Sequence, residues 1–198
     1  MKIVLATNNA HKLDEIRAML SDLNVEILSL QDIGFSEDIA ETEDSLEGNA
    51  FLKAQHIADR YDYAVIADDS GLEVDALDGA PGVYSARYAG PPRDDNRNMD
   101  KLLLDLKSVA LDKRTARFAS VIAFVNNETR VSFKGIVEGK ISSEKSGNAG
   151  FGYDPIFIPD GQDQSFAELG EEIKNSMSHR RNAVDLLKEF LKVYLANH

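Results

Sequence analysis

The sequence predicts an α/β fold in which helices flank a long mixed sheet, within one domain that has two lobes and a central cleft. Short apolar runs of strand length alternate with segments of helical periodicity, as in a sheet covered by helices. Two strand-like segments near the middle follow each other without a helix, so antiparallel neighbours are expected beside parallel ones. A length of 198 residues suits one domain, residues 1–198.

The first half of the chain is predicted to alternate strands and helices. Strands are expected at residues 2–7, 25–30 and 64–67, and the third is expected to end at the run 68–71. Apolar residues recur at helical spacing after the first strand, at Leu13, Ile16, Leu20 and Leu23. A second helix carries Leu46, Ala50, Ala54, Ile57 and Ala58.

The second half is predicted to contain an antiparallel strand pair between two helices. A loop at 77–92 precedes a helix marked by Met99, Leu102, Leu103 and Leu106. Strands at 115–125 and 130–141 flank a short polar turn. A glycine-rich loop at 146–155 leads to a strand at 156–158, and a last helix begins near Ser178.

Composition excludes several classes of protein. The formal net charge of −12 argues against a nucleic-acid backbone as partner, which needs clustered Lys and Arg. No apolar run is long enough to span a membrane, the N-terminus turns polar too early for a signal peptide, and cysteine is absent. We therefore expect a cytoplasmic protein without a membrane or nucleic-acid partner, in which local cations or a metal hold any anionic ligand.

The first candidate motif joins the first strand to the first helix. It consists of Thr7, Asn8, Asn9, Ala10, His11 and Lys12. Such a junction exposes backbone N–H groups and the positive end of the helix dipole, which suit phosphate oxygens, and Lys12 adds a full charge. A plain helix cap explains the asparagines equally, because Asn is a favoured N-cap residue.

The second motif is acidic. Glu41 and its acidic neighbours offer oxygen ligands for Mg²⁺, and Lys53 lies four residues after Asn49, so both side chains are expected on one helix face. Acidic residues also favour the first turn of a helix without any metal, and Lys53 is also compatible with a solvated cation.

The third motif places two adjacent carboxylates, Asp68 and Asp69, after a short apolar strand. Ligands of open α/β sheets bind at the carboxyl ends of strands. Neighbours along a strand face opposite sides, so one Asp is expected in the cleft, as metal ligand or general base, and the other in the framework. An Asp-Ser-Gly turn is the alternative.

Two further motifs lie in the last third of the chain. Phe151 and Tyr153 sit in a glycine-rich loop and offer aromatic faces on which a base can stack, although a hairpin loop with core aromatics fits them too. His179, Arg180 and Arg181 follow Ser178 in the first turn of the last helix, where the dipole disfavours cations. A nearby ligand anion or carbonyl would explain them, as would pairing with the acidic body of the protein.

In their order and spacing, these motifs resemble the inosine/xanthosine triphosphate pyrophosphatase family, also called Ham1 or RdgB-like. The resemblance covers nearly the whole chain. It rests on residues 7–12, Glu41 with residues 49–54, and the runs 67–72, 79–88, 151–155 and 178–180. It implies a homodimer with an active cleft, and hydrolysis of non-standard purine nucleoside triphosphates such as ITP, dITP and XTP to the monophosphate and pyrophosphate.

The resemblance also implies roles for individual residues. Residues 7–12 and Lys53 would bind phosphates, while Glu41 and Asp69 would hold Mg²⁺. Asp69 is also the implied general base, and Asp68 would help to position the metal or its waters. Substrate contacts are implied for Ser70, Phe151, Gly152, Tyr153, Asp154, Lys174, His179 and Arg180. A nucleotide sensor without catalysis, a structural domain, or a pyrophosphatase for modified pyrimidines are the competing hypotheses.

Overall fold

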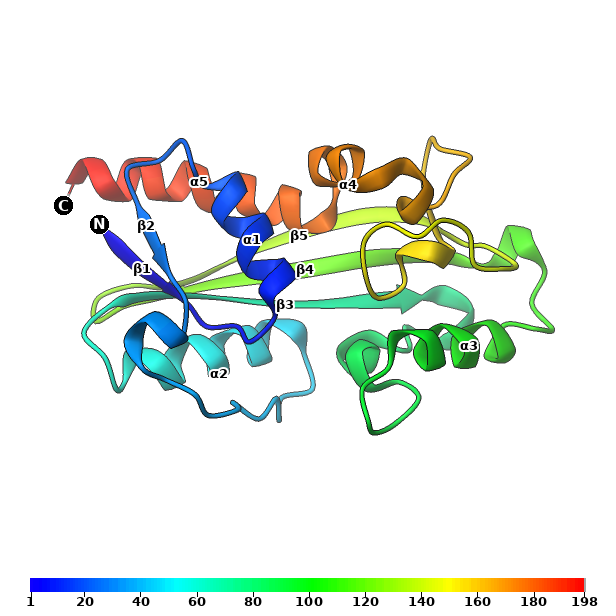
Figure 1. Cartoon of the computed structure of the whole chain (residues 1–198), viewed down its shortest axis with the longest axis horizontal. Helices are drawn as coiled ribbons and strands as arrows, with labels where there is room; N and C mark the ends of the chain where they lie inside the picture. The colour runs from blue at the N-terminus through cyan, green and yellow to red at the C-terminus, as the bar shows by residue number, and fades with distance from the viewer. Residues whose placement is uncertain (198) are drawn as a thin grey trace. The chain divides into compact units, whose positions relative to one another are not determined.

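The computed structural model of the chain describes residues 1–197 and contains a six-stranded sheet with the order β2-β1-β3-β4-β5-β6 (Figure 1). β1 pairs in parallel with β2 and with β3, whereas β5 and β6 are antiparallel, so the predicted mixed α/β class is confirmed. The strands are β1 (Lys2–Leu5), β2 (Glu26–Leu28), β3 (Ala64–Val74), β4 (Thr115–Val125), β5 (Arg130–Ile141) and β6 (Phe157–Pro159). The helices are α1 (Ala10–Met19), α2 (Leu46–Ala58), α3 (Asp95–Asp105), α4 (Phe166–Met177) and α5 (His179–Asn197).

The chain divides into two compact units. Unit 1 comprises Met1–Asp69, Ser120–Gly135 and Arg180–His198. Unit 2 comprises Ser70–Ala119 and Ile136–His179. The boundary falls within β3, β4 and β5, so each of these strands contributes residues to both units.

The core of unit 1 forms where alternate side chains of the sheet meet helices. Leu5 and Ile66 belong to one buried cluster with Ile16 of α1 and Leu187 of α5. Because alternate strand residues share a face, these contacts place α1 and α5 on the same side of the sheet. α2 lies on the opposite side of the strands in Figure 1. The layers of unit 1 are therefore helix, sheet and helix.

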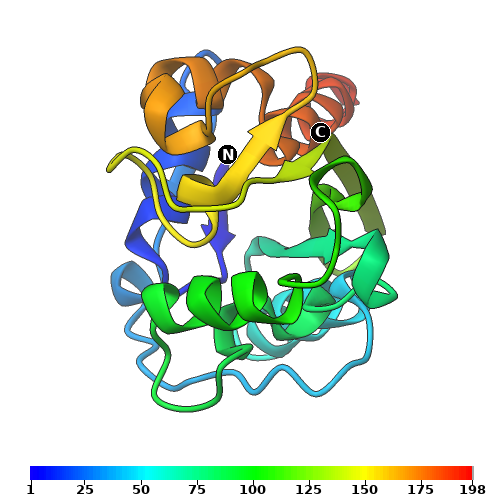
Figure 2. The ribbon, with the colours of Figure 1, turned by 90° about the vertical axis from the view of Figure 1, so that its right-hand side faces the viewer.

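Aromatic rings dominate the core of unit 2. The ring centroid of Phe157 lies 4.6 Å from that of Phe118 and 5.3 Å from that of Phe166. Met99 and Leu102 of α3 belong to the same cluster. Figure 2 shows β6 in yellow beside the end of β5, with which it pairs.

β3 is longer than the sequence predicts. The expected end of this strand at residues 68–71 is wrong, because β3 continues to Val74. Leu72 and Val74 are fully buried in unit 2 and extend the alternating apolar pattern past the two aspartates. A Cβ atom on Gly71 would lie only 2.4 Å from the carbonyl oxygen of Gly82, so glycine is required at this close approach.

α4 was not predicted from the apolar periodicity. A capping box starts this helix: the Ser165 hydroxyl accepts from the backbone N–H of Glu168, and the Glu168 carboxylate accepts from the N–H of Ser165. Gly170 then interrupts the helix with φ of 83°. The Ser-x-x-Glu spacing of Ser165 and Glu168 is the pattern in the sequence that indicates the start of this helix.

Leu187→Ala is expected to lower the free energy of unfolding by about 2–5 kcal/mol, because it leaves a cavity in the core of unit 1. Urea unfolding followed by circular dichroism measures this change. Leu186→Ala is the matched control on the same helix, since Leu186 is 50% exposed, and its effect should stay within about 0.5 kcal/mol. Equal losses in both variants would contradict the packing of α5.

Candidate active site

The two aspartates of β3 lie just past the end of β1. The last paired residue of β1 is Leu5, opposite Ile66, and the backbone N–H of Ala6 still donates to the Ile66 carbonyl at 2.8 Å. Asp68 and Asp69 follow at the carboxyl end of β1, where parallel sheets bind ligands. The prediction that the pair ends its own strand is wrong, because β3 continues to Val74, but the pair lies beside the carboxyl end of β1.

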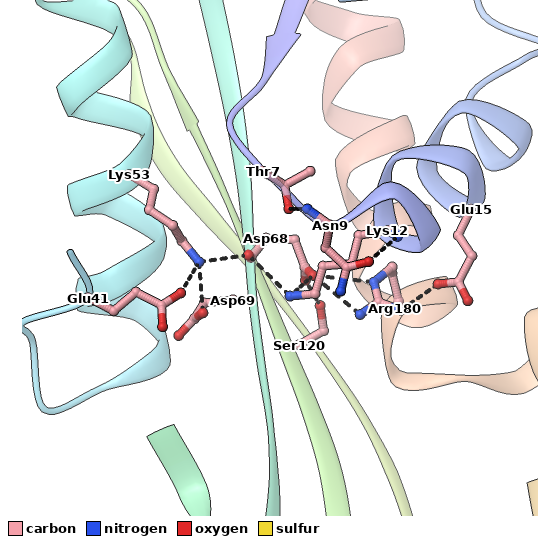
Figure 3. A network of polar contacts seen from close by, with 10 residues as sticks. All are labelled: Thr7, Asn9, Lys12, Glu15, Glu41, Lys53, Asp68, Asp69, Ser120 and Arg180. Atoms are coloured by element: carbon pink, nitrogen blue, oxygen red, sulfur yellow. Dashed lines mark hydrogen bonds and ion pairs between the residues drawn. The ribbon is translucent and has the colours of Figure 1, made fainter. Parts of the chain in front are cut away.

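The Asp68 carboxylate contacts two basic side chains and one hydroxyl, which come from three parts of unit 1 (Figure 3). Its Oδ2 lies 2.7 Å from Lys12 Nζ on α1 and 3.3 Å from Arg180 Nε on α5. Its Oδ1 accepts a short hydrogen bond from the Ser120 hydroxyl on β4. Arg180 in turn forms an ion pair with Glu15, one turn beyond Lys12. The carboxylate of Asp68 thus ties α1, α5 and β4 to β3.

These contacts keep Asp68 ionised although its side chain is buried. The side chains of Asp68 and Arg180 are 0% and 1% exposed. Burial alone would raise the pKa of Asp68, but Lys12 and Arg180 outweigh it and hold the pKa well below its usual value. Burial lowers the pKa of Lys12, against the opposing effect of Asp68. Asp68 therefore serves as a fixed anion that orients the cations around it.

A second group lies beside the first and is centred on Lys53 of α2. The Lys53 ammonium lies 2.9 Å from Glu41 Oε1 and 2.8 Å from Asp69 Oδ1, and it donates to the backbone carbonyl of Asp68 at 3.0 Å. The carboxylates of Asp68 and Asp69 thus contact different side chains, as expected for neighbours that face opposite sides of a strand. Figure 3 shows the two groups meeting at Asp68.

The pKa values of Glu41 and Asp69 shift in opposite directions around this ammonium. Burial raises the pKa of Asp69 to about 6, although Lys53 and Lys12 act in the opposite direction. Burial would also raise the pKa of Glu41, but Lys53 outweighs it and lowers the pKa to about 2. Burial disfavours a charged Lys53, yet Asp69 and Glu41 together raise its pKa. A carboxyl with a pKa close to neutral pH suits proton transfer.

The residues present fit a magnesium ion. Glu41 and Asp69 converge on one cationic point, the Lys53 ammonium. Mg²⁺ is commonly bound by one or two carboxylates, with waters and substrate phosphates as its other ligands. Among residues 1–197, no group of three or more His, Cys, Asp or Glu side chains is arranged to hold a metal. The two carboxylates thus suit a cation whose other ligands are waters and substrate phosphates.

The predicted phosphate loop turns out to be a helix cap as well. The Asn9 side chain accepts from the backbone N–H of Lys12 at 3.3 Å, and Thr7 Oγ1 accepts from the N–H of Asn9. The Asn8 amide donates to Asp38 at 2.9 Å, while Ala10 and His11 are exposed in the first turn of α1. Of the six predicted residues, Lys12 is the one that reaches the carboxylates of β3.

In unit 2, Asp154 and Lys174 form a buried ion pair beneath the glycine-rich loop. The two charged atoms are 2.7 Å apart, and both side chains are 3% exposed. Asp154 also accepts from the backbone N–H of Phe151, and the Lys174 ammonium lies 4.3 Å from the centroid of the Phe151 ring. A Cβ atom on Gly150 would lie 2.1 Å from the Asp154 carboxylate, so the loop requires glycine there.

Three residues of unit 2 that are predicted to contact substrate also have partners within the protein. Tyr153 is buried in the aromatic core and donates to the carbonyl of Ser85, so its ring is no open stacking surface. The Gly152 N–H donates to Asp95 at 2.9 Å. The His179 ring stacks on Phe118 at 4.8 Å between centroids. The hairpin-loop alternative accounts for Tyr153, whereas Phe151 stays half-exposed. Ser70, half-buried, follows Asp69 on β3.

Arg180 lies with the carboxylates of unit 1 rather than with the aromatic loop. Its ion pairs with Asp68 and Glu15 explain a cation in the first turn of α5, as does the pair of Arg181 with Asp185 at 2.8 Å. The contact of Arg180 with a purine base stays a prediction, in addition to its observed contact with Asp68.

Two residues of the network were missed from the sequence. Glu15 follows Lys12 by three positions, which places both on one face of α1. Ser120 is the one hydroxyl in the apolar run of residues 118–125 and is fully buried. The sequence shows both features, but it does not indicate that Glu15 contacts Arg180 or that Ser120 contacts Asp68.

Comparison with known proteins shows relatives that match nearly the whole chain. A dITP/XTP pyrophosphatase of Porphyromonas gingivalis is 54% identical over 190 residues, covering 96% of this chain and 97% of the relative. One of Flavobacterium psychrophilum is 49% identical, covering 97% and 100%. The structure of the Staphylococcus aureus Ham1 protein superposes with a TM-score of 0.90 and 41% identity, covering 98% of this chain and 100% of that one.

The family model agrees with these relatives. The model of the Ham1 family matches residues 3–190, which is nearly the whole chain and includes every predicted site residue. The chain therefore belongs to the Ham1 family.

Proposed function

We propose that this enzyme hydrolyses non-standard purine nucleoside triphosphates, among them ITP, dITP and XTP, to the nucleoside monophosphate and pyrophosphate. Family membership and the relatives named dITP/XTP pyrophosphatase support this function. The observation that carries it is the meeting of two lysines, Lys12 and Lys53, with the carboxylates Glu41 and Asp69 around β3. Such an enzyme removes deaminated purine nucleotides before they enter DNA or RNA.

The phosphates are assigned to the cations of unit 1. Lys12 and Lys53 lie on either side of Asp68 and supply full positive charges for a polyanion. Thr7 and the exposed first turn of α1 add hydrogen-bond donors and the positive end of the helix dipole. Asp68 and Arg180 keep Lys12 oriented.

Glu41 and Asp69 are assigned to Mg²⁺. Bound there, this ion supplies neutralisation of the charge on phosphate oxygens and on the departing pyrophosphate. Both carboxylates already face a shared cation in the form of Lys53.

Asp69 is assigned as the general base. A water molecule attacks the α-phosphorus in line with the bond to the bridging oxygen, and Asp69 takes the proton of that water. The new P–O bond forms as the bond to the bridging oxygen breaks, so that pyrophosphate leaves with the bonding electrons. The contact of Asp69 with Lys53, which is assigned to the phosphates, supports this assignment.

Base choice is assigned to unit 2. Inosine and xanthosine carry a carbonyl at position 6, where adenosine carries an amine. Donors on Lys174 or His179 are satisfied by the carbonyl, but an amine would leave buried polar groups unpaired. The half-exposed ring of Phe151 is assigned to stacking, with Ser70, the Gly152 backbone and Asp154 around the sugar and base.

Three further properties are proposed by analogy with the family. We assign a homodimer, a cytoplasmic location and a single domain of residues 1–198. Among the helices of residues 1–197, none has the length and apolar character required to cross a bilayer.

Asp69→Asn is expected to lower kcat by about 10² to 10⁴-fold, because the amide cannot accept the proton of water. Pyrophosphate release from ITP with Mg²⁺ measures the loss, and circular dichroism checks the fold. Asp44→Asn makes the same change at an exposed carboxylate three positions after Glu41 and should keep kcat within about twofold. Activity retained in Asp69→Asn would remove this residue from the base role.

A panel of triphosphates tests the base assignment. The ratio kcat/KM for ITP, dITP and XTP should exceed that for ATP by up to about 10⁴-fold, because adenine presents a donor to protein donors. Pyrophosphate release is compared with and without Mg²⁺, with GTP and modified pyrimidine triphosphates in the same panel. Equal values for ITP and ATP would contradict the assignment, and a preference for pyrimidines would favour the competing substrate class.

A further inference from the structure

Lys53 lies between Glu41 and Asp69, the two carboxylates assigned to the metal. Its ammonium has three oxygen neighbours at 2.8–3.0 Å, one each from Glu41, Asp69 and the backbone of Asp68. An ammonium group has three donors, so this set saturates it. The side chain is only 11% exposed. Lys53 is therefore fixed at the centre of the carboxylate pair.

This arrangement solves an electrostatic problem of the nucleotide-free enzyme. Glu41 and Asp69 are two acidic groups that share a partly buried site, and without a cation they would repel each other. A buried charge that loses its partner destabilises the fold strongly. The Lys53 ammonium supplies the missing charge.

A divalent cation and this ammonium exclude each other. Two positive charges held against the same oxygen atoms repel strongly in a site with little water. Binding of the metal thus requires Lys53 to leave at least one carboxylate. Lysine has a flexible four-carbon stem, and the Asp68 carbonyl remains an acceptor during such a movement.

We propose that Lys53 is a built-in substitute for the metal: it holds Glu41 and Asp69 together in the empty enzyme and exchanges with the metal when a triphosphate arrives. The phosphate oxygens give the displaced ammonium a new anionic partner, so metal and nucleotide bind cooperatively. This inference rests on the proposed function, because it uses the metal ligands assigned there. It adds that the empty enzyme disfavours free divalent cations.

Mn²⁺ binding to the nucleotide-free enzyme tests the exchange, with free Mn²⁺ measured by electron paramagnetic resonance. Lys53→Met keeps the length of the side chain and removes its charge, so Mn²⁺ should bind at least about tenfold more tightly than to the wild type. Lys12→Met is the matched control: it also removes a buried ammonium from unit 1, but one that contacts Asp68. Its effect should stay below about threefold.

The cooperativity between metal and nucleotide binding provides a second test of the exchange. An ITP analogue with a non-cleavable α–β linkage should tighten Mn²⁺ binding in the wild type by a larger factor than in Lys53→Met, because coupling between two ligands is reciprocal and here passes through Lys53. If Lys53→Met does not fold by circular dichroism, Lys53→Gln takes its place in both measurements.

The possible failures are distinguishable. Unchanged or weaker Mn²⁺ binding in Lys53→Met, together with binding that Glu41→Gln still abolishes, would overturn the exchange and leave the proposed metal ligands in place. Mn²⁺ binding that is tightened equally by Lys53→Met and Lys12→Met would show that any lost positive charge has this effect. That result would also overturn the exchange. Mn²⁺ binding that neither Glu41→Gln nor Asp69→Asn weakens would overturn the ligand pair itself, and with it the metal part of the proposed function.

Discussion

The ionised carboxylate of Asp68 is the group on which the organisation of unit 1 depends. It is buried in the middle of a strand and receives Lys12, Arg180 and Ser120 on its two side-chain oxygens. Its backbone carbonyl receives Lys53. A buried anion is tolerated only when it is paired and hydrogen-bonded, and each partner here comes from a different helix or strand. The requirement to satisfy one charge therefore brings the groups assigned to the phosphates to one place.

The neighbouring carboxylate, Asp69, is in a different situation. It shares Lys53 with Glu41, and burial raises its pKa toward neutral pH. A raised pKa in a carboxyl means that its charged form is disfavoured in the folded protein, so this group costs stability above the ordinary pKa of Asp. Sites of this kind are kept for their chemistry rather than for the fold. Two adjacent residues on one strand thus differ in their electrostatics: the pKa of Asp68 is lowered and the pKa of Asp69 is raised.

In unit 2, the glycine-rich loop is held by close packing together with one buried ion pair. In unit 1, the corresponding contacts are mainly between charged groups. The loop of unit 2 is shaped by Gly150, whose missing side chain admits the Asp154 carboxylate, and by the Lys174 ion pair beneath it. Tyr153 anchors the loop in the aromatic core. The ring of Phe151 is thereby held half-exposed by buried neighbours.

The sequence by itself determined the α/β class, most helix and strand positions, the family, and a set of site residues that includes Lys12, Lys53 and Asp69. These follow from local periodicity and from motifs that are contiguous in the chain. Only the tertiary structure decided that β3 continues past the aspartates, and that Arg180 and Ser120 hold Asp68. Ser120 lies 52 positions from Asp68 and Arg180 lies 112 positions away. Pairing over such distances is set by how strands and helices pack, and no local pattern of residue types encodes it.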